Sequence, residues 1–296
     1  MKTPLFRGAG VAIITPFKQD GSINFDKFAE LVEQQIAAGT AAIIVCGTTG
    51  ETSTLHTEEH QALVRFCVER TAHRIPVIAG CGSNHTDYAI EMGKFCASAG
   101  VDGLLMVTPY YNKCSQTGLA RHMTSIVEAA GIPGILYNVP SRTGVSFTAE
   151  TYELLSRHPL INGVKEASGN FDLMAETRHR CGDELCLWSG NDSQVVPTMA
   201  LGGDGVISVV SNIAPAAMAK VCSLMLAGRT AEAAKAADRI HPLSRDLFLE
   251  VNPIPVKTAM NLMGMEVGGF RMPLCEMSPA NAEKLAATLR SCGLLR

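Results

Sequence analysis

Short runs of β-branched and other apolar residues recur along the first two thirds of the chain, separated by longer amphipathic segments. Brief apolar runs between turn residues are typical of buried strands, and strands covered on both faces need not alternate polar and apolar positions. The runs predict strands at 11–14, 42–45, 77–79, 103–107, 135–137, 163–165, 186–189 and 206–209.

The segments between these runs carry apolar side chains at helical spacing. Residues 25–36 place theirs on one face, which is the pattern of a helix that packs on a sheet. Asn24 is the expected N-cap of this helix, and Gly39 is its expected stop. Thr57, followed by two glutamates, opens the next helix, because carboxylates stabilise the positive end of a helix dipole.

Eight strands that alternate with helices over about 200 residues predict an α/β protein with a (β/α)8 barrel, the TIM barrel fold. An open doubly wound sheet usually has fewer strands, and no GxGxxG motif follows the first strand. Beyond the eighth strand the pattern is purely helical, at 214–226, 231–248, 255–263 and 279–292. We therefore expect a barrel domain at 1–227 and a C-terminal helical domain at 228–296.

Composition excludes several classes of function. The 296 residues carry a formal net charge of −3 and one tryptophan, so they offer neither the basic surface nor the stacking platforms of a nucleic-acid-binding protein. No apolar stretch approaches the ~20 residues that span a bilayer, and the run at 11–14 is too short for a signal peptide. None of the ten cysteines forms a CxxC pair, which favours a reduced, cytoplasmic protein without structural zinc.

Lys165 occupies the most informative position in the chain, because it ends an apolar run that predicts a buried strand. Burying a lysine is costly unless its amine is paired or takes part in chemistry. Desolvation favours the neutral amine, and a neutral amine attacks a carbonyl carbon to form an imine. The alternative is a lysine that pairs with Glu166 or extends its amine to solvent.

Reactive side chains follow the carboxyl ends of the expected strands, where barrel enzymes build their active sites. In chain order these are Thr48, Thr49, Tyr110, Tyr111, Tyr137, Arg142 and Lys165. Phenols, hydroxyls, one guanidinium and one amine suit carbonyl and carboxylate chemistry through an imine better than metal-assisted hydrolysis. Taken singly, the threonine turn, Tyr137 and Arg142 also fit a strand-ending turn, a barrel-lining aromatic and a surface charge.

Other signals are weaker. His56 and His60 have the spacing of a metal pair, but no third ligand accompanies them, and exposed residues at a helix start are the better interpretation. The glycine-rich segment 202–205 resembles a phosphate-binding loop of pyridoxal enzymes, yet it precedes the eighth strand and so lies at the opposite end of the barrel. Lys257 follows two prolines in a helical segment, a poor place for a buried nucleophile. We expect no metal and no cofactor.

Five motifs together resemble the dihydrodipicolinate synthase family, the lysine-pathway branch of the pyruvate-dependent, Schiff-base class I aldolases. They are GTTGE at 47–51, TPYYN at 108–112, YNVPSRTG at 137–144, the lysine at 165 and NPIPVK at 252–257. The motifs occur in order and span essentially the whole chain. The resemblance implies a lyase that condenses pyruvate with L-aspartate 4-semialdehyde in diaminopimelate and lysine biosynthesis.

The resemblance also implies a role for the residues at each matched position. Lys165 forms the imine with pyruvate. Tyr137, Thr49 and Tyr111 form a proton relay in which Tyr137 is the general acid and base, and Tyr111 comes from the neighbouring subunit of a tight dimer. The expected assembly is a homotetramer, a dimer of such dimers.

Substrate-binding residues are implied in the same way. Thr48 and Thr49 bind the pyruvate carboxylate through their hydroxyls. Arg142 binds the carboxylate of the semialdehyde, where a forked guanidinium adds geometric selectivity. Gly190 and Ile207 match positions that line the pyruvate site.

Two alternatives remain beside this function. A sister lyase such as N-acetylneuraminate lyase shares the barrel, the lysine and the tyrosine of the fifth strand, but it usually has serine where this chain has Thr48, and it lacks the arginine at position 142. A catalytically silent barrel that senses sugar acids is the other alternative, and the complete set of relay residues speaks against it.

The lysine feedback site of the family is only partly matched. In lysine-sensitive relatives a histidine and a glutamate, among other groups, hold the effector at the tight-dimer interface. The matching positions here carry Thr57 and Tyr88, whereas His60, Asn84 and Tyr110 are retained. We therefore expect inhibition by L-lysine to be weak or absent.

Overall fold

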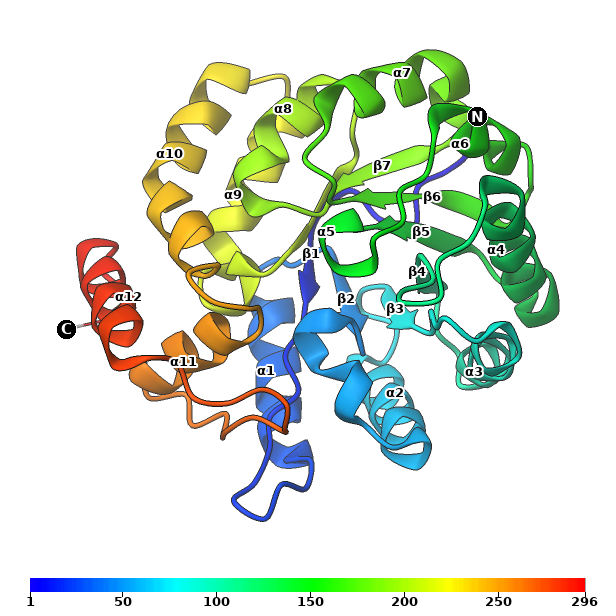
Figure 1. Ribbon diagram of the computed structural model, residues 1–296. Helices are drawn as coiled ribbons and strands as arrows, with labels where there is room; N and C mark the ends of the chain where they lie inside the picture. The colour runs from blue at the N-terminus through cyan, green and yellow to red at the C-terminus, as the bar shows by residue number, and fades with distance from the viewer. Residues whose placement is uncertain (296) are drawn as a thin grey trace.

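The computed structural model describes residues 1–295 and folds them around one closed barrel of parallel strands (Figure 1). The strands are β1 (Gly8–Ala12), β2 (Ala42–Val45), β3 (Val77–Gly80), β4 (Gly103–Val107), β5 (Gly134–Asn138), β6 (Ile161–Glu166), β7 (Cys186–Ser189) and β8 (Gly205–Ser208). Each strand pairs with the next in chain order, and β8 closes the barrel on β1, with Gly205 opposite Gly8. The predicted barrel fold is confirmed.

Helices form an outer layer around the strands (Figure 1). They are α1 (Phe25–Ala37), α2 (Thr57–Thr71), α3 (Thr86–Ser98), α4 (Gln116–Ala130), α5 (Pro140–Thr143), α6 (Ala149–Ser156), α7 (Phe171–Cys181), α8 (Val195–Ala200) and α9 (Pro215–Leu226). The predicted N-cap of α1 is confirmed, because the Asn24 side chain accepts a hydrogen bond from the Lys27 N–H at 3.1 Å. Within residues 1–295, none of the helices combines the length and apolar character needed to cross a membrane.

Buried apolar side chains form two clusters, one on each side of the sheet. The larger cluster lies between the strands and the helices and includes Phe28, Leu63 and Ile126. The smaller cluster takes alternate residues of the strands and fills the barrel interior. Its Trp188 stacks on Phe6, with ring centroids 5.0 Å apart, and Phe6 precedes β1, so this pair fills the amino-terminal end of the barrel. The carboxyl-terminal end of the barrel is therefore the end at which a functional site can form.

The first strand begins earlier than the apolar run at 11–14 predicts, because β1 includes Gly8 and Gly10. Glycine is disfavoured in strands, so sequence patterns place a strand after such residues. Packing explains the glycine here: a Cβ at Gly10 would lie 2.7 Å from Ile44 Cδ1 and 2.9 Å from a ring carbon of Phe6. Of the remaining strands, β2, β4 and β7 match the predicted runs, and the others differ from them by one or two residues at their ends.

Three helices follow the barrel: α10 (Thr230–Asp246), α11 (Ile254–Leu262) and α12 (Pro279–Ser291). The prediction of a purely helical C-terminal region is confirmed, while the boundary between 1–227 and 228–296 as separate domains stays a prediction. Figure 1 shows that the chain leaves α11 and passes near α1 before it reaches α12. The Phe17 N–H donates to the Val267 carbonyl at 3.0 Å, so this crossing segment lies against the barrel.

Candidate active site

Lys165 lies inside the barrel, one residue before the end of β6. In the strand register it stands between Tyr137 of β5 and Trp188 of β7, and both belong to the interior cluster. Residues that are opposite one another in a sheet share one face, so the lysine points inward. Lys165 is 6% exposed, and its amine lies 4.2 Å from the centroid of the Tyr137 ring. The barrel therefore holds an amine against a phenol ring.

Glu166 is not the partner of this amine. Its carboxylate accepts hydrogen bonds from Asn138 Nδ2 at 3.0 and 3.1 Å, from the Tyr152 hydroxyl at 2.8 Å and from the Ser168 N–H at 2.8 Å. Successive residues of a strand point to opposite faces, so Glu166 faces the outer layer while Lys165 faces the interior. The interpretation of Lys165 as half of a pair with Glu166 is therefore wrong.

The turn after β2 carries the two predicted threonines. Thr48–Gly50 form η1, a single 3-10 turn in which Thr49 is buried and Thr48 is partly exposed. The Thr49 hydroxyl accepts a hydrogen bond from Asn252 Nδ2 at 2.9 Å. Because a hydroxyl has one proton to give and that proton is not used here, Thr49 can donate it to a carboxylate or a phenol oxygen.

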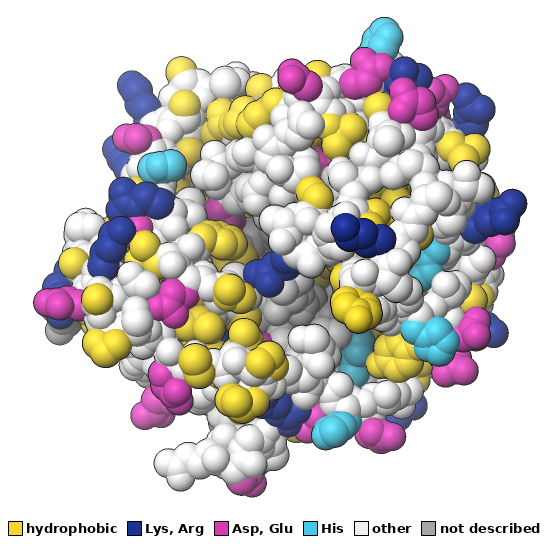
Figure 2. Space-filling view, viewed as in Figure 1, with side chains coloured by type: hydrophobic (Ala, Val, Ile, Leu, Met, Phe, Trp, Pro, Cys, Tyr) yellow, Lys and Arg dark blue, Asp and Glu magenta, His cyan; other side chains and the backbone are white. Residues whose placement is uncertain are grey.

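A cavity opens at the carboxyl ends of the strands. Its lining includes four of the predicted residues, Thr48, Tyr110, Tyr137 and Arg142, whereas Lys165 and Thr49 lie next to lining residues but outside the lining itself. Figure 2 shows a hollow near the middle of this face, with Lys and Arg side chains beside it. The rest of the lining is glycine, hydroxyl, thiol and apolar, so the Arg142 guanidinium is its one charged group. A cavity of this character suits a small anionic substrate.

Asn252, which no sequence motif marked as functional, contacts two of the predicted residues. It is 6% exposed, it donates to Thr49, and its backbone carbonyl accepts a hydrogen bond from Arg142 Nη2 at 3.1 Å. The available signal was the motif NPIPVK, which begins at this residue. The motif alone does not reveal that its asparagine reaches residues 203 and 110 positions away in the chain.

Tyr111 lies outside the cavity lining of its own chain. Its side chain is 91% exposed, and its backbone has a φ of 69°, a left-handed conformation that non-glycine residues seldom adopt. The next residue, Asn112, donates from Nδ2 to the Asn84 carbonyl at 2.9 Å and ties this loop to the segment before α3. The phenol is thus presented outward, where a second subunit can receive it.

Gly190 and Ile207 both occupy tightly packed positions, Gly190 just after β7 and Ile207 within β8. A Cβ at Gly190 would lie 2.6 Å from the Cβ of Ala167, and the Gly190 N–H donates to the Glu166 carbonyl at 2.7 Å. Only glycine fits this approach of β7 to the end of β6. Ile207 is fully buried in the interior cluster.

Asp192 adds a buried negative charge on this side of the barrel. Burial raises its pKa, and hydrogen bonds and the positive charge of Lys165 act in the opposite direction. Its Oδ2 accepts the N–H groups of Val209 and Val210, each at 3.0 Å. The carboxylate therefore fixes the turn that follows β8 and lies within electrostatic range of the Lys165 amine.

The predicted feedback residues and the histidine near them lie in different environments. His60 is buried, contrary to the expectation of an exposed residue at a helix start, and its Nε2 lies 2.9 Å from the Gly80 carbonyl. Burial lowers the pKa of His60 to about 4. His56 is the exposed N-cap of α2, as expected. Tyr88 packs partly buried on the outer core. Within residues 1–295, no group of three or more His, Cys, Asp or Glu residues is arranged to hold a metal ion.

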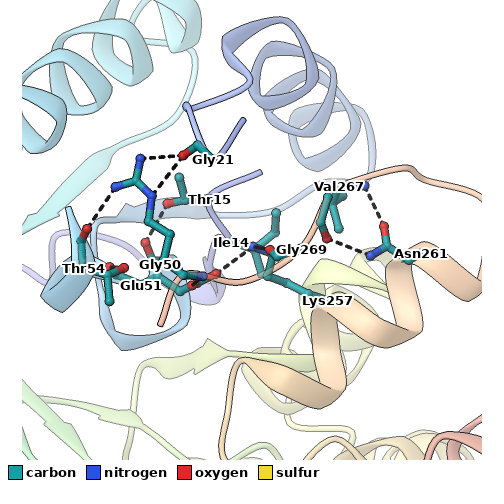
Figure 3. Close-up of polar contacts among 12 residues, drawn as sticks. Ile14, Thr15, Gly21, Gly50, Glu51, Thr54, Lys257, Asn261, Val267 and Gly269 are labelled. Carbon is teal, nitrogen blue, oxygen red and sulfur yellow. Dashed lines mark hydrogen bonds and ion pairs between the residues drawn. The ribbon is translucent and has the colours of Figure 1, made fainter. Parts of the chain in front are cut away.

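Lys257, whose segment we interpreted as a poor place for a buried nucleophile, is nevertheless fully buried. Its Nζ lies 2.7 Å from Glu51 Oε1, and neither side chain is accessible to solvent. Figure 3 shows Lys257, Glu51 and Gly269 together where the C-terminal chain meets the turn after β2. Burial lowers the pKa of Lys257, and the Glu51 carboxylate acts against this shift. A paired amine of this kind is not a free nucleophile.

A (β/α)8 barrel with an amine, phenols and hydroxyls at the carboxyl ends of its strands has the architecture of a class I aldolase-type lyase. A family model described as the dihydrodipicolinate synthetase family matches residues 5–292. The chain belongs to this family.

Individual relatives agree over the full length. The chain is 52% identical over 294 residues to the 4-hydroxy-tetrahydrodipicolinate synthase of Thermoanaerobacter sp. (strain X514), covering 99% of each chain. It is 50% identical over 287 residues to the enzyme of the same name from Clostridium novyi (strain NT), covering 97% of each. The crystal structure of chloride-inhibited dihydrodipicolinate synthase from Acinetobacter baumannii, complexed with pyruvate, superimposes with a TM-score of 0.96 at 41% identity, covering 98% of this chain and 99% of that one.

Proposed function

We propose that this chain condenses pyruvate with L-aspartate 4-semialdehyde, as a 4-hydroxy-tetrahydrodipicolinate synthase, and that Lys165 is the amine that captures pyruvate. The observation that carries the assignment of the residue is a buried amine on β6, 4.2 Å from the Tyr137 ring centroid, which Glu166 does not neutralise. Relatives at 50% identity and above, over nearly the whole chain, carry this activity in their names.

The chemistry follows from the amine. The neutral amine adds to the keto carbon of pyruvate, and loss of water gives an imine. Loss of a proton from the methyl group gives an enamine, whose carbon attacks the aldehyde of the second substrate, forms the new carbon–carbon bond and regenerates an imine at Lys165. The amino group of the semialdehyde then attacks the imine carbon and displaces the lysine amine, which closes the ring and frees Lys165. Protons move at each step, and Tyr137 is the general acid and base best placed to carry them. Thr49, whose hydroxyl proton is left free by Asn252, relays them onward.

Carboxylate binding accounts for the remaining residues. Thr48 and Thr49 present hydroxyls to the carboxylate of pyruvate, and Gly190 and Ile207 pack against the captured molecule, with Ile207 keeping water from the enamine. Arg142 receives the carboxylate of the semialdehyde at the mouth, since it is the one charged group in the lining. The same two features, Thr48 and Arg142, favour the semialdehyde over N-acetylneuraminate.

The last catalytic group of the proposed site comes from another subunit. We assign Tyr111 to the site of a neighbouring subunit within a homotetramer built from two tight dimers. The support is that Tyr111 is 91% exposed and held in a left-handed backbone conformation, which is costly for a tyrosine that serves no purpose.

A cytoplasmic location and the absence of a cofactor complete the proposal. The ten cysteines are all free thiols and most are buried, which fits a reducing compartment. Imine chemistry with pyruvate needs no redox group, since the lysine and the substrates supply every atom of the reaction.

Borohydride trapping tests the proposed amine. Reduction in the presence of pyruvate is expected to leave one stable adduct per chain, on the peptide that contains Lys165. Lys165→Met is the control and is expected to give no adduct and no condensation activity. An adduct on Lys257, or an active enzyme that is never trapped, would contradict the assignment. Side-by-side assays with aspartate semialdehyde and N-acetylneuraminate are expected to give turnover with the first alone.

A further inference from the structure

We propose that the buried pair of Lys257 and Glu51 is a positioning device for the pyruvate site, through which helix α11 sets the turn that carries Thr48 and Thr49. The inference rests on the proposed function, because it assumes that these threonines bind the pyruvate carboxylate. It gives the C-terminal helices a part in substrate binding in addition to any part in stability.

The pair is complete and closed to solvent. Lys257 Nζ contacts Glu51 Oε1 at 2.7 Å and also donates to the Gly269 carbonyl. The other carboxylate oxygen, Oε2, accepts the Arg271 N–H at 3.2 Å. The rings of Phe17 and Phe270 cover the amine, with centroids 4.3 and 5.3 Å away. Each polar atom therefore has a partner, as a buried ion pair requires if it is to hold its geometry.

The pair acts on a turn that needs an external restraint. Glu51 joins η1 to the second 3-10 turn, η2 (Thr52–Thr54), and it does so with φ 55° and ψ 33°. This left-handed conformation is unfavourable for a glutamate and persists only where surrounding contacts enforce it. Lys257 and Arg271 supply those contacts from 206 and 220 residues away in the chain.

Neighbouring residues of the turn are held by other segments. Thr49 accepts from Asn252, which lies just before α11, and the Gly50 carbonyl accepts from the Thr15 hydroxyl at 2.6 Å, as Figure 3 shows for the second contact. Residues 49, 50 and 51 are thus each fixed by a separate contact, two of them from the region of α11. A hydroxyl that binds a carboxylate must be held within a fraction of an ångström of its productive position, and supporting contacts of this kind hold it there.

Neither side chain of the pair is accessible to solvent, and both carboxylate oxygens of Glu51 are occupied by Lys257 and by the Arg271 backbone N–H. Glu51 and Lys257 therefore act through the turn and do not contact the reacting atoms. The expected signature is a loss of pyruvate binding that exceeds the loss for the semialdehyde, because Arg142 is held by the turn of α5 and by Asn252.

The test is a titration of the Lys165 adduct against pyruvate, with borohydride as the trap, in wild type and in Lys257→Met. Methionine keeps most of the side-chain volume and removes the bond to the turn. The pyruvate concentration for half-maximal trapping is expected to rise about tenfold or more. Among variants that turn over, KM for pyruvate should rise several times more than KM for the semialdehyde.

Asp246→Asn is the matched control. Asp246 is another buried carboxylate of the C-terminal region, and it bonds to Arg245 and Thr288, away from the turn. This variant is expected to melt at a lower temperature while trapping pyruvate at wild-type concentrations. In Lys257→Met the Glu51 carboxylate is left buried without its cationic partner. The double variant Glu51→Gln with Lys257→Met removes that charge, so it is expected to be more stable than Lys257→Met. Its half-maximal trapping is still expected to require a higher pyruvate concentration than that of wild type.

The outcomes separate the two proposals. If wild type forms no adduct at Lys165, the proposed function fails. If wild type is trapped and Lys257→Met, folded at the same temperature, is trapped at the same pyruvate concentrations, the positioning role is overturned. Should Lys257→Met fail to fold, Glu51→Gln takes its place, because its single amide oxygen accepts from Lys257 or from the Arg271 backbone N–H but not from both, and its amide nitrogen is a donor that cannot replace the second contact; unchanged trapping in that variant overturns the proposal equally.

Discussion

At the scale of single residues, two lysines in this chain are buried, and only one was predictable. Lys165 ends an apolar run, so its burial follows from the local pattern. Lys257 lies in a helix behind two prolines, and its carboxylate partner is 206 residues away, so no local pattern could reveal either its burial or its pairing. Glu166 illustrates the opposite case, because strand alternation alone separates it from Lys165.

His60 gives a prediction for pH. The folded state lowers its pKa from 6.5 to about 4 because the ring is buried, so between these values the unfolded chain binds a proton that the folded chain does not. The stabilising contribution of the neutral ring is therefore complete above pH 6.5 and is lost as the pH falls toward 4, by about 3 kcal/mol. Urea unfolding at pH 7 and pH 4.5 measures this loss.

The matched variant is His60→Gln, which does not titrate and is able to keep a hydrogen bond to Gly80. Its free energy of unfolding should fall less between the two pH values than that of wild type. His122, whose pKa burial also lowers, is common to both proteins and cancels in the difference. Equal losses in wild type and variant would show that His60 does not titrate as assigned.

At the scale of elements, apolar runs located the strands and their alternation with helices, and they misplaced the start of β1. A run of apolar residues cannot mark Gly10 as a strand residue, because its suitability comes from Phe6 and Ile44, whose side chains pack where a Cβ would lie. Contacts between elements far apart in the chain could not be predicted from the sequence either. Asn252 is the clearest example, since its motif was visible and its two contacts were not.

The prediction on feedback inhibition by L-lysine concerns residues at the starts of α2 and α3. Thr57 and Tyr88 stand where the resemblance implies a histidine and a glutamate, so an L-lysine amino group would lack its anionic partner. Such a loss costs about 1.5–3 kcal/mol, and a contact of the ammonium with the Tyr88 ring returns only about 0.5–1 kcal/mol. Initial rates across a lysine titration should show little inhibition below about 1 mM.

Tyr88→Glu is the informative counterpart, because it restores a carboxylate at that position. It is expected to bind lysine more tightly than wild type by up to about tenfold to a hundredfold. Strong inhibition of wild type at micromolar lysine would mean that the missing groups do not matter.

At the scale of the whole molecule, the single chain leaves one proposed relay member, Tyr111, facing away from its own cavity. The barrel and its strand-end residues were predictable from periodicity and motifs. The direction in which a loop presents its side chain was not, since it depends on a backbone φ of 69° that nothing in the local sequence demands. Only the resemblance assigned this tyrosine to another subunit.

Mixed oligomers test that assignment. Lys165→Ala and Tyr111→Phe are each expected to be severely impaired, since each lacks one group of every site. Co-assembled, they form some sites in which one subunit supplies Lys165 and its neighbour supplies Tyr111, so activity should exceed the sum of the parents. Mass spectrometry of the mixture establishes subunit exchange. Proven exchange without any gain in rate would place Tyr111 in its own subunit's site or outside catalysis.

The contacts that Asn252 and Lys257 make with the turn after β2 bear on how freely enzymes of this architecture are recombined. A chimera that joins one parent's barrel to another parent's terminal helices inherits a glutamate and a lysine selected in different backgrounds. The crossover point therefore matters less than the compatibility of positions 49–51 and 252–257, which contact one another although the gene separates them by some 200 codons. Libraries designed around barrel boundaries alone would keep those contacts only where both parents carry matching residues at these positions.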